Sequence, residues 1–253
     1  MHTPQLLTSK LLQNSNLLHA FTTRHGGVST APYHSFNLAF HVGDNALHVK
    51  ENHQILGETL GYDYRRLVHM RQLHSDIVHI VDENDDFHHP PQCDALITNQ
   101  KNTPLMIMSA DCTPVILYDP VQQVITVVHA GRAGAFLNII EKSLQTMRTR
   151  FTCNAQNIIA VLGPSIHGCC YEINAQIASE AKQLGYGDMI TRKACGIYLH
   201  VNRIVKKQLR DLGVQDDAIE ELLYCTACRH ERFFSYRADN HITGRLGAVI
   251  MLQ

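Results

Sequence analysis

The sequence has no tryptophan, little charge and no long apolar run, and these shortages exclude several classes of protein. Lys and Arg number 22 against 23 Asp and Glu, a net charge of −1, so no overall field attracts nucleic acid or an anionic membrane. No stretch approaches the ~18 uninterrupted apolar residues of a membrane-spanning helix. Residues 1–12 also lack the basic patch and apolar stretch of a signal peptide. We therefore expect a cytoplasmic protein whose partners include neither nucleic acid nor membrane.

The composition that remains is that of a folded chain rich in metal-ligating side chains. Of its 253 residues, 45% are hydrophobic, which excludes a disordered chain, and no repeat or Gly/Ser-rich linker divides it. We expect a single domain over residues 1–253, and a monomer. The 17 histidines and 8 cysteines supply many potential ligands. Because the expected compartment is reducing, we interpret the cysteines as free thiols and not as a disulfide framework.

Short apolar runs and longer helical patterns predict a mixed fold. The expected strands are Ile77–Val81, Ala95–Thr98, Leu105–Met108, Val115–Tyr118, Val124–Val128 and Ala248–Leu252, and the expected helices are Asn45–Leu60, Phe136–Phe151 and Val201–Leu212. The strands between residues 95 and 128 are apolar throughout and do not alternate, so both of their faces should be covered. Residues 82–92, rich in acids, His and Pro, predict an exposed loop. Strands and helices mixed in this way indicate an α+β fold with helices outside packed sheets.

Three potential metal ligands stand where strands are expected to end. Cys112 follows the strand through Met108, His129 closes the strand through Val128, and His74 precedes the strand that begins at Ile77. If the first two strands are neighbours in one sheet, both side chains lie at the same end of it. Two imidazoles and one thiolate can hold zinc and leave the fourth tetrahedral position open, as catalytic zinc sites do. From spacing alone, ordinary hydrogen-bonded histidines remain the alternative.

Several ordered blocks resemble those of the bacterial laccase-domain family. The three signature blocks are Gln72-Leu73-His74-Ser75, Ser109-Ala110-Asp111-Cys112-Thr113-Pro114-Val115 and His129-Ala130-Gly131. Similar matches are found over residues 21–29, 35–38, 41–44, 162–172, 232–237 and 243–245. The resemblance therefore covers the chain from about residue 20 to the C-terminus, in blocks that keep the family's order within one domain.

The resemblance implies a fold, an activity and a set of ligands. The fold is a four-layer α/β/β/α sandwich of mixed sheets flanked by helices. The family, first called polyphenol oxidases, is read as zinc-dependent purine nucleoside phosphorylases with adenosine deaminase activity, acting on phosphate and on nucleosides of the adenosine, inosine, guanosine and methylthioadenosine class. Its metal ligands fall on His74, Cys112 and His129. One departure is that Arg132-Ala133 stand where the family usually has Trp and a basic residue, which leaves the role of that basic residue open.

Phosphorolysis and deamination each assign roles to particular side chains. Arg24, followed by Gly26-Gly27, offers a guanidinium and a flexible backbone for phosphate, with a tight turn as the alternative. Arg132 lies where residues 131–134 open a helix, whose N-terminus also favours phosphate. Asp111 is the expected proton carrier for deamination by a metal-activated water, or else a carboxylate that orients His74 or His129. Gln72 and Asn37 are expected to contact ribose or base, with structural turns as the alternative.

Two other enzymes and one further group of cysteines complete the expectations. A copper-dependent polyphenol oxidase is disfavoured, because no histidine stands two residues from another as multicopper clusters require, although copper suits the same ligands. Without a metal, Cys112 and His129 could form the nucleophile and base of an amide hydrolase in peptidoglycan precursor editing. We expect Cys225 and Cys228, like the adjacent pair Cys169-Cys170 whose side chains should project apart, to be reduced thiols packed near the core.

Overall fold

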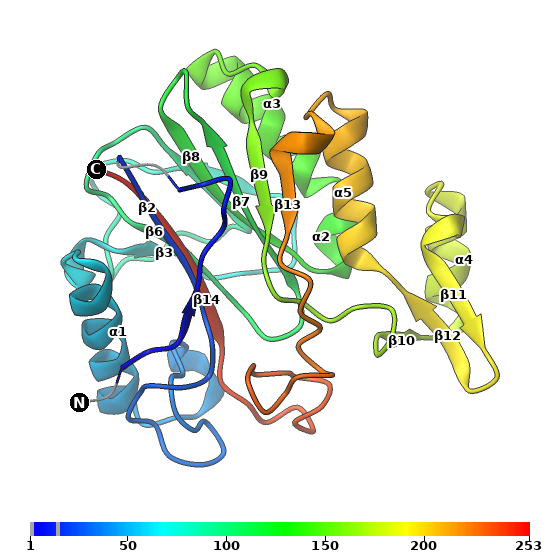
Figure 1. Ribbon diagram of the computed structural model, residues 1–253, viewed down its shortest axis with the longest axis horizontal. Coiled ribbons are helices and arrows are strands. Elements are labelled where there is room, and N and C mark those ends of the chain that lie inside the picture. The colour runs from blue at the N-terminus through cyan, green and yellow to red at the C-terminus, as the bar shows by residue number, and fades with distance from the viewer. Residues whose placement is uncertain (1–2, 14–15) are drawn as a thin grey trace.

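The computed structural model describes residues 3–13 and 16–253, and its centre is a pair of stacked β-sheets (Figure 1). The first sheet has five strands in the order β1-β2-β14-β6-β3. Its strands are β1 Leu6–Leu7, β2 Leu17–Thr22, β3 Val68–His69, β6 Leu105–Ser109 and β14 Leu246–Leu252. The strand β14 pairs antiparallel with both β2 and β6, so the expected closing strand lies in the middle of this sheet.

The second sheet has six strands in the order β13-β9-β7-β8-β5-β4. They are β4 Val78–Ile80, β5 Ala95–Thr98, β7 Thr113–Asp119, β8 Val124–Ala130, β9 Ile159–Leu162 and β13 Ile219–Glu221. The four inner strands are antiparallel, whereas the edge strands β4 and β13 pair in parallel with their neighbours, which makes the sheet mixed.

Residues 3–13 and 16–253 contain five α-helices and several short 3-10 turns, and four of these helices flank the two sheets. The helices are α1 Ala46–Leu60, α2 Arg132–Phe136, α3 Ile139–Phe151, α4 Ala175–Gln183 and α5 Val201–Asp211. Asn45 caps α1 by accepting the backbone N–H of Leu47, which explains why this helix begins where expected. The pattern expected to form one helix over Phe136–Phe151 is divided into α2 and α3, because Asn138 adopts a left-handed conformation with φ 62°. None of these helices is long and apolar enough to cross a bilayer.

Hydrophobic side chains fill three separate interfaces and define four layers. Along β14, Ala248 and Ile250 point between the two sheets, whereas Val249 and Met251 point toward α1. On the outer face of the six-stranded sheet, Val128 packs with Ile139 of α3, and Ile204 of α5 joins the same cluster. The order is therefore helix, sheet, sheet, helix (Figure 1), and the expected α/β/β/α sandwich is confirmed. The covering of both faces of the central strands is confirmed as well.

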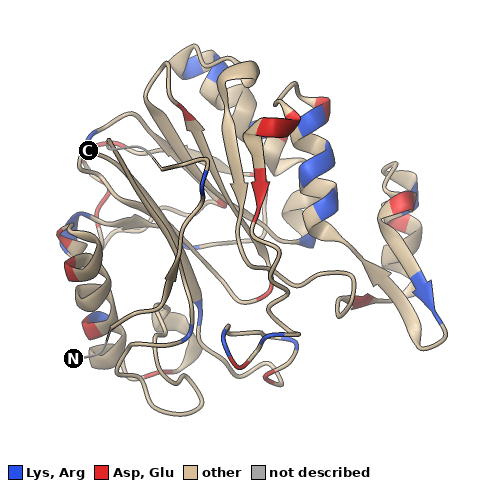
Figure 2. Cartoon of the chain, viewed as in Figure 1, with Lys and Arg blue, Asp and Glu red and all other residues tan. Residues whose placement is uncertain are grey.

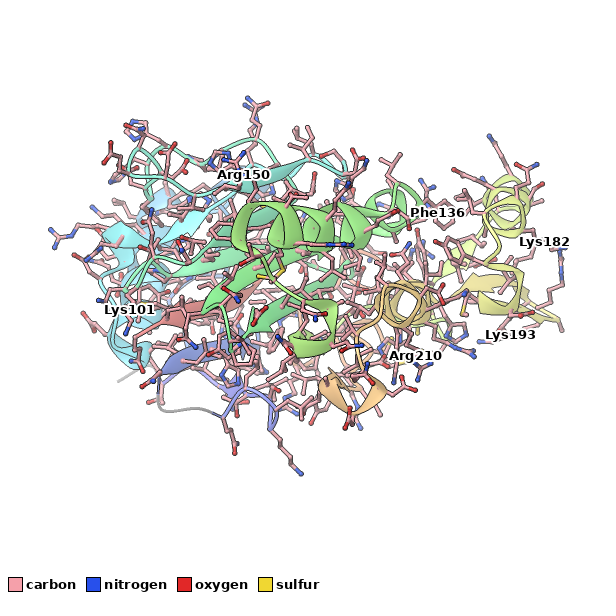
Figure 3. The ribbon with its side chains drawn as sticks, turned by 90° about the horizontal axis from the view of Figure 1, so that it is seen from above. Lys101, Phe136, Arg150, Lys182, Lys193 and Arg210 are labelled. Atoms are coloured by element: carbon pink, nitrogen blue, oxygen red, sulfur yellow. The ribbon has the colours of Figure 1, made fainter. Side chains whose placement is uncertain are left out.

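A small lobe projects from one side of the sandwich. It consists of α4 and the three-stranded sheet β10-β12-β11, formed by Glu172–Ile173, Gly196–Leu199 and Ile190–Lys193. Figure 3 shows Lys182 and Lys193 on this lobe, far from Lys101 at the opposite end of the molecule. Charged residues of both signs lie mainly on helices and loops and rarely within the strands (Figure 2). This distribution is expected because the strands of the two main sheets are mostly buried.

His53 of α1 is a titratable side chain that the fold buries completely. It is fully buried, its Nε2 lies 2.8 Å from the carbonyl oxygen of Leu38, and its ring stacks on Phe40 with the ring centroids 5.6 Å apart. Burial, together with the neighbouring His69, lowers the pKa of His53 to about 3. The folded protein therefore keeps this imidazole neutral at a pH where the unfolded chain would protonate it.

We predict that His53 makes the protein less stable in mild acid. A histidine whose folded-state pKa is lowered contributes stability above its ordinary pKa of 6.5, and this stability is lost as the pH falls toward 3. Between pH 7.5 and pH 5 the loss from one such group is about 2 kcal/mol. In His53→Gln, the fall in the free energy of unfolding over this range should be smaller by about that amount, measured by urea denaturation. The exposed His89→Gln should behave like the wild type, and an unchanged fall in His53→Gln would contradict the prediction.

Candidate metal centre

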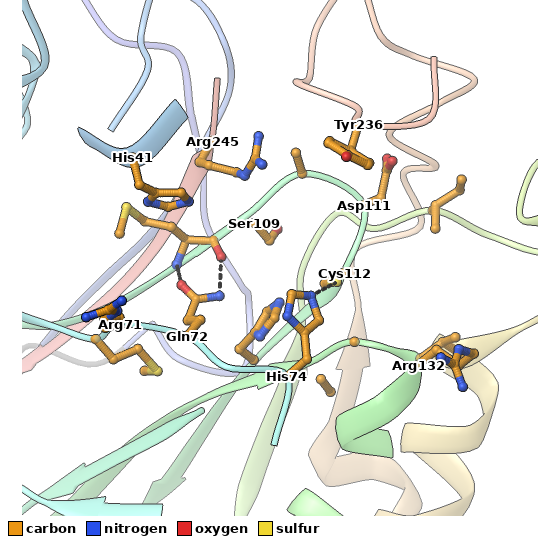
Figure 4. Close-up of a pocket in the computed structure, with 18 of the residues that line it drawn as sticks. His41, Arg71, Gln72, His74, Ser109, Asp111, Cys112, Arg132, Tyr236 and Arg245 are labelled. Atoms are coloured by element: carbon orange, nitrogen blue, oxygen red, sulfur yellow. Dashed lines mark hydrogen bonds between the residues drawn. The ribbon is translucent and has the colours of Figure 1, made fainter. Parts of the chain in front are cut away.

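The side chains of His74, Cys112 and His129 converge at one point between the two sheets and α2. Their ligand atoms all lie within 4.8 Å of one another, and Nε2 of His74 is 3.8 Å from Sγ of Cys112. The rings of His74 and His129 meet edge to face, with their centroids 4.8 Å apart. Figure 4 shows His74 and Cys112 directed toward each other at the base of an open space. The structure thus brings together the three residues that the sequence singled out.

The pairing of β7 with β8 places the cysteine beside the second histidine. Thr113 at the start of β7 is opposite Ala130 at the end of β8. Cys112 and His129 therefore lie at the same end of these two neighbouring strands. The expectation that the strand before Cys112 neighbours the strand of His129 is wrong. That strand, β6, belongs to the other sheet, and it is the strand after Cys112 that makes the contact.

The buried carboxylate of Asp94 fixes both histidines. It accepts hydrogen bonds from the backbone N–H groups of Leu73, His74 and Ser75, at 2.7–3.1 Å, and from the hydroxyl of Ser75 at 2.7 Å. Nδ1 of His129 lies 2.9 Å from Oδ1 of Asp94, so Nε2 of that ring is left to face the centre. His74 itself has φ 58°, a conformation that the three N–H bonds around it hold. Sequence reasoning missed Asp94, although a lone acid directly before a buried strand is a signal for such a role.

The electrostatics of the centre favour a thiolate next to a protonated imidazole. Burial alone would raise the pKa of Cys112, but the positive charge of His129 and hydrogen bonds from both histidines lower it to about 6. Burial alone would lower the pKa of His129, but the Cys112 thiolate and the Asp94 carboxylate raise it to about 9. Hydrogen bonds from His129 and Ser75 likewise overcome burial and lower the pKa of Asp94 to about 2. A preformed thiolate is the form of cysteine that binds a metal, and His129 would release its Nε2 proton on binding the ion.

These three donors fit a zinc ion. In a tetrahedral site with Zn–S and Zn–N bonds of about 2.3 and 2.1 Å, sulfur and nitrogen lie about 3.5 Å apart. The 3.8 Å between Cys112 and His74 is close to this value. One thiolate with two imidazoles also matches the donor preference of zinc and leaves a fourth position open. In residues 3–13 and 16–253 the only other group of three or more metal-ligating side chains consists of cysteines, so the histidine sets of a four-copper oxidase are not gathered there.

The centre opens into a cavity of about 950 Å³ with a positively charged wall. Four guanidinium groups line it, from Arg71, Arg132, Arg237 and Arg245, against the single carboxylate of Asp111. In Figure 4, Arg71, Arg132 and Arg245 lie on different sides of the metal ligands. Aromatic rings, among them those of Phe40, Tyr171 and Tyr236, complete the lining. Such a cavity suits a ligand that combines an anion with a flat apolar group.

Asp111 and Gln72 line the cavity, but neighbouring groups engage both side chains. The strand β6 has ended before Asp111, which has φ 94°. Its carboxylate accepts hydrogen bonds from the hydroxyls of Thr226 and Ser235 and from the backbone N–H of Arg237, each at 2.7 Å. The orienting role considered for Asp111 falls instead to Asp94 at His129. The amide of Gln72 donates to the carbonyl and accepts from the N–H of Met108, which ties the His74 loop to β6 (Figure 4).

Arg24 and Asn37, expected to contact substrate, are not among the residues that line the cavity. The guanidinium of Arg24 donates to the carbonyls of His34 and His230 and lies over the ring of Phe234, so its bonds join loops of the protein. Asn37 is fully buried, and its amide bonds Ala39, Asp44 and the backbone N–H of Arg245. For Asn37 the structural turn is the better interpretation. Its partner Arg245 does line the cavity. Neither Arg245 nor Arg237 was identified as a site residue from the sequence.

Comparison with known proteins identifies the family and the fold of the chain. A family model described as multi-copper polyphenol oxidoreductase laccase matches residues 18–253. A protein of Corynebacterium glutamicum named purine nucleoside phosphorylase is 36% identical over 243 residues, covering 95% of this chain and 96% of that protein. One of Streptomyces coelicolor with the same name is 32% identical over 240 residues, or 92% of this chain and 94% of its own length. The crystal structure of a hypothetical protein, YfiH, of Bacillus licheniformis superposes with a TM-score of 0.93 at 30% identity, covering 100% of this chain and 97% of that one.

Gly131 tests whether the centre binds metal as the geometry indicates. A Cβ at this position would lie 2.9 Å from Sγ of Cys112 and 3.1 Å from Cδ2 of His74, although the backbone, with φ −72°, accepts any residue. We therefore predict that Gly131→Ala displaces both ligands and raises at least tenfold the zinc concentration that protects Cys112 from alkylation, followed by mass spectrometry. Gly187→Ala, where the nearest atom lies at 3.7 Å, is the matched control. Equal protection in both variants would show that the three side chains do not share an ion.

Proposed function

Because this chain belongs to the multi-copper polyphenol oxidoreductase laccase family, and its relatives are named purine nucleoside phosphorylases, we propose that it is a zinc-dependent purine nucleoside phosphorylase that also deaminates adenosine. The observation that carries the proposal is the joining of a two-histidine, one-cysteine centre to a cavity lined by four guanidinium groups. Phosphorolysis needs an anion site beside the ribose, and deamination needs an activated water. The cavity offers donors for both reactions.

Arg71 and Arg132 are the guanidinium groups best placed to receive phosphate. Within residues 3–13 and 16–253, no hydrogen bond or ion pair engages the side chain of Arg71. Arg132 has one ion pair, with the half-exposed Glu180 at 3.6 Å. In contrast, Arg237 donates to the carbonyl of Glu172, and Arg245 to those of residues 243 and 244. The guanidinium with fewer protein partners loses least when it binds an anion bidentately. Arg132 also supplies positive charge where the family usually has a basic residue one position later.

The base of a nucleoside would contact the aromatic part of the cavity. Phe40 is 41% exposed and Tyr236 45% exposed, values that are high for large rings beside a cavity. The guanidinium of Arg245 lies 5.6 Å and the ring of His241 4.6 Å from the centroid of the Tyr236 ring, so a base can contact only the part of this ring that both leave exposed. A flat purine can stack on such a ring and gain about 1 kcal/mol beyond the burial of its area.

Zinc held by the three ligands would supply Lewis-acid activation of water for the deamination. The part of the protein is to carry the proton, and Asp111 is the only carboxylate among the residues that line the cavity. Its Oδ1 accepts two hydrogen bonds and its Oδ2 accepts one, so Oδ2 keeps a lone pair that can take a proton. In the overall reaction, adenosine and water give inosine and ammonia. Phosphate then displaces hypoxanthine from C1′ of inosine and forms ribose 1-phosphate.

A second function has its own supporting observation. Asp94, His129 and Cys112 stand in the order carboxylate, imidazole and thiol, and the thiol has a lowered pKa, as in a cysteine hydrolase. In that case the protein would cleave an amide, for example in peptidoglycan precursor editing, without any metal. The four arginines of the cavity favour the phosphorolytic function, since hydrolysis of an amide does not require a phosphate site.

We predict that the zinc-loaded protein converts inosine and phosphate into hypoxanthine and ribose 1-phosphate, and that adenosine also yields inosine. Chromatography of the products checks both reactions. His74→Ala, Cys112→Ala and His129→Ala should each abolish turnover, because a three-ligand site cannot lose one ligand and keep its ion. Stripping the metal with a chelator should abolish it as well, and zinc should restore it. If metal-free protein instead cleaves a peptidoglycan stem peptide, and alkylation of Cys112 stops that cleavage, the amide hydrolase is the correct function.

A second prediction concerns the phosphate site. Arg132→Met and Arg71→Met each keep most of the unbranched stem of the side chain and remove the charged guanidinium, so each should raise the KM for phosphate by tenfold or more while the KM for inosine changes little. Initial rates at varied phosphate and fixed inosine measure this effect. Arg150→Met, on the exposed end of α3 (Figure 3), is the control and should match the wild type. An unchanged phosphate KM in both cavity variants would remove these arginines from the anion site.

A further inference from the structure

Four cysteines outside the cavity form a second cluster of metal ligands. This four-cysteine cluster consists of Cys169, Cys170, Cys225 and Cys228, whose sulfur atoms all lie within 4.8 Å of one another. Sγ of Cys228 is 3.4 Å from that of Cys169 and 3.2 Å from that of Cys170. All four are free thiols, but the expectation that they pack near the core is wrong for three of them. Cys169 and Cys228 are exposed, and only Cys225 is buried.

Local backbone geometry explains the convergence. Cys169-Cys170 lie in a turn and not in extended chain, with the N–H of Cys170 donating to the carbonyl of His167, so the adjacent side chains do not point to opposite sides. Cys225 and Cys228 stand in another turn, which follows β13. A backbone bridge between Ser165 and Cys225 joins the two turns. The fold therefore brings the CxxC pair, Cys225 and Cys228, next to a second pair of cysteines that lies 55 or more residues earlier in the sequence.

The separations of the sulfur atoms suit a metal ion and not a disulfide. A disulfide requires sulfur atoms about 2.05 Å apart, and all eight cysteines of the chain are free. Four thiolates around a zinc ion, with Zn–S bonds of about 2.3 Å, lie about 3.8 Å from one another. The sulfur–sulfur distances of 3.2 and 3.4 Å, and the 4.8 Å within which all four sulfur atoms lie, are close to this value. In addition, the backbone N–H of His167 donates to Sγ of Cys225 at 3.4 Å, a bond that stabilises a thiolate.

We propose that the four-cysteine cluster binds a second zinc ion, in a closed structural site separate from the metal centre of the cavity. Four sulfur ligands fill the tetrahedron of zinc and leave no position for water or substrate, which is the pattern of structural zinc. The ion would clamp the turn before β10 to the turn after β13. Lys193, whose Nζ donates to the carbonyl of Cys169, places a positive charge beside the negatively charged site.

The clamp would also support one wall of the cavity. Thr226, which lies between the two cysteines of the CxxC segment, donates its hydroxyl to Oδ1 of Asp111 at 2.7 Å. The backbone N–H of Ile166, three residues before Cys169, donates to the carbonyl of Asp111 at 2.8 Å. Both turns of the cluster thus hold the residue adjacent to the Cys112 ligand. The second ion would therefore stabilise the position of Asp111 in the cavity wall, although the ion itself would lie outside the cavity.

Counting zinc ions tests the proposal without any assay of activity. Protein purified under reducing conditions, loaded with zinc and desalted should contain two zinc ions per chain by mass spectrometry of the metal, one for each cluster. Cys228→Ser should contain one, His129→Ala should contain one, and the double variant none. Cys195→Ser, which changes an exposed cysteine of the adjacent lobe outside the cluster, is the matched control and should keep two.

Alkylation of the wild-type protein tests the site even if Cys228→Ser fails to fold. Cys169, Cys195 and Cys228 are all exposed, so in the metal-free protein each should react with an alkylating reagent, with Cys169 slower because burial raises the pKa of its thiol to about 12. With zinc bound, Cys195 should react first, and Cys169 and Cys228 should react only after a chelator removes the ion. The proposal is overturned if all three react together in the zinc-loaded protein, if the wild type holds one ion that His129→Ala loses, or if Cys228 forms a disulfide in the native protein.

Discussion

The carboxylate of Asp94 is the constraint on which the metal centre depends. Buried at the start of β5, it takes three backbone N–H groups of the Leu73–Ser75 turn and the imidazole of His129. One charged group therefore sets the place of both histidines, which come from different elements, and fixes the ring nitrogen that faces the ion. A buried carboxylate is stable only when its lone pairs are satisfied in this way. The same bonds that make Asp94 tolerable inside the protein thus hold the ligands in position.

The sequence predicted those parts of the molecule that depend on local pattern. Apolar runs located the central strands, their lack of alternation indicated cover on both faces, and the ends of strands located Cys112 and His129. The four-layer arrangement was predicted from the resemblance to the family. Periodicity alone does not distinguish it from other α+β arrangements. What could not be predicted was pairing over long distances. The sequence did not indicate that β6 and β7, separated by three residues, enter different sheets.

The same limit explains the errors at individual residues. Arg24 and Asn37 stand in family blocks, but whether such a residue contacts substrate or joins loops depends on partners such as Phe234, His230 and Arg245, more than 200 positions away. The adjacent cysteines at 169 and 170 were expected to diverge because extended backbone was assumed, whereas the chain turns there. In each case a correct local rule was applied to a backbone conformation that distant contacts decide.

The position of β14 has a consequence for how the protein is made. Residues 246–252 form the middle strand of the five-stranded sheet and separate β2 from β6. Until these residues leave the ribosome, two strands synthesised much earlier each keep an unpaired hydrogen-bonding edge, and Phe21 and Ile107 lack part of the surface that covers them. Unpaired strand edges and exposed apolar side chains promote aggregation, so the nascent chain is most vulnerable during this interval. The architecture thus postpones closure of its first sheet until residues 246–252 have been synthesised.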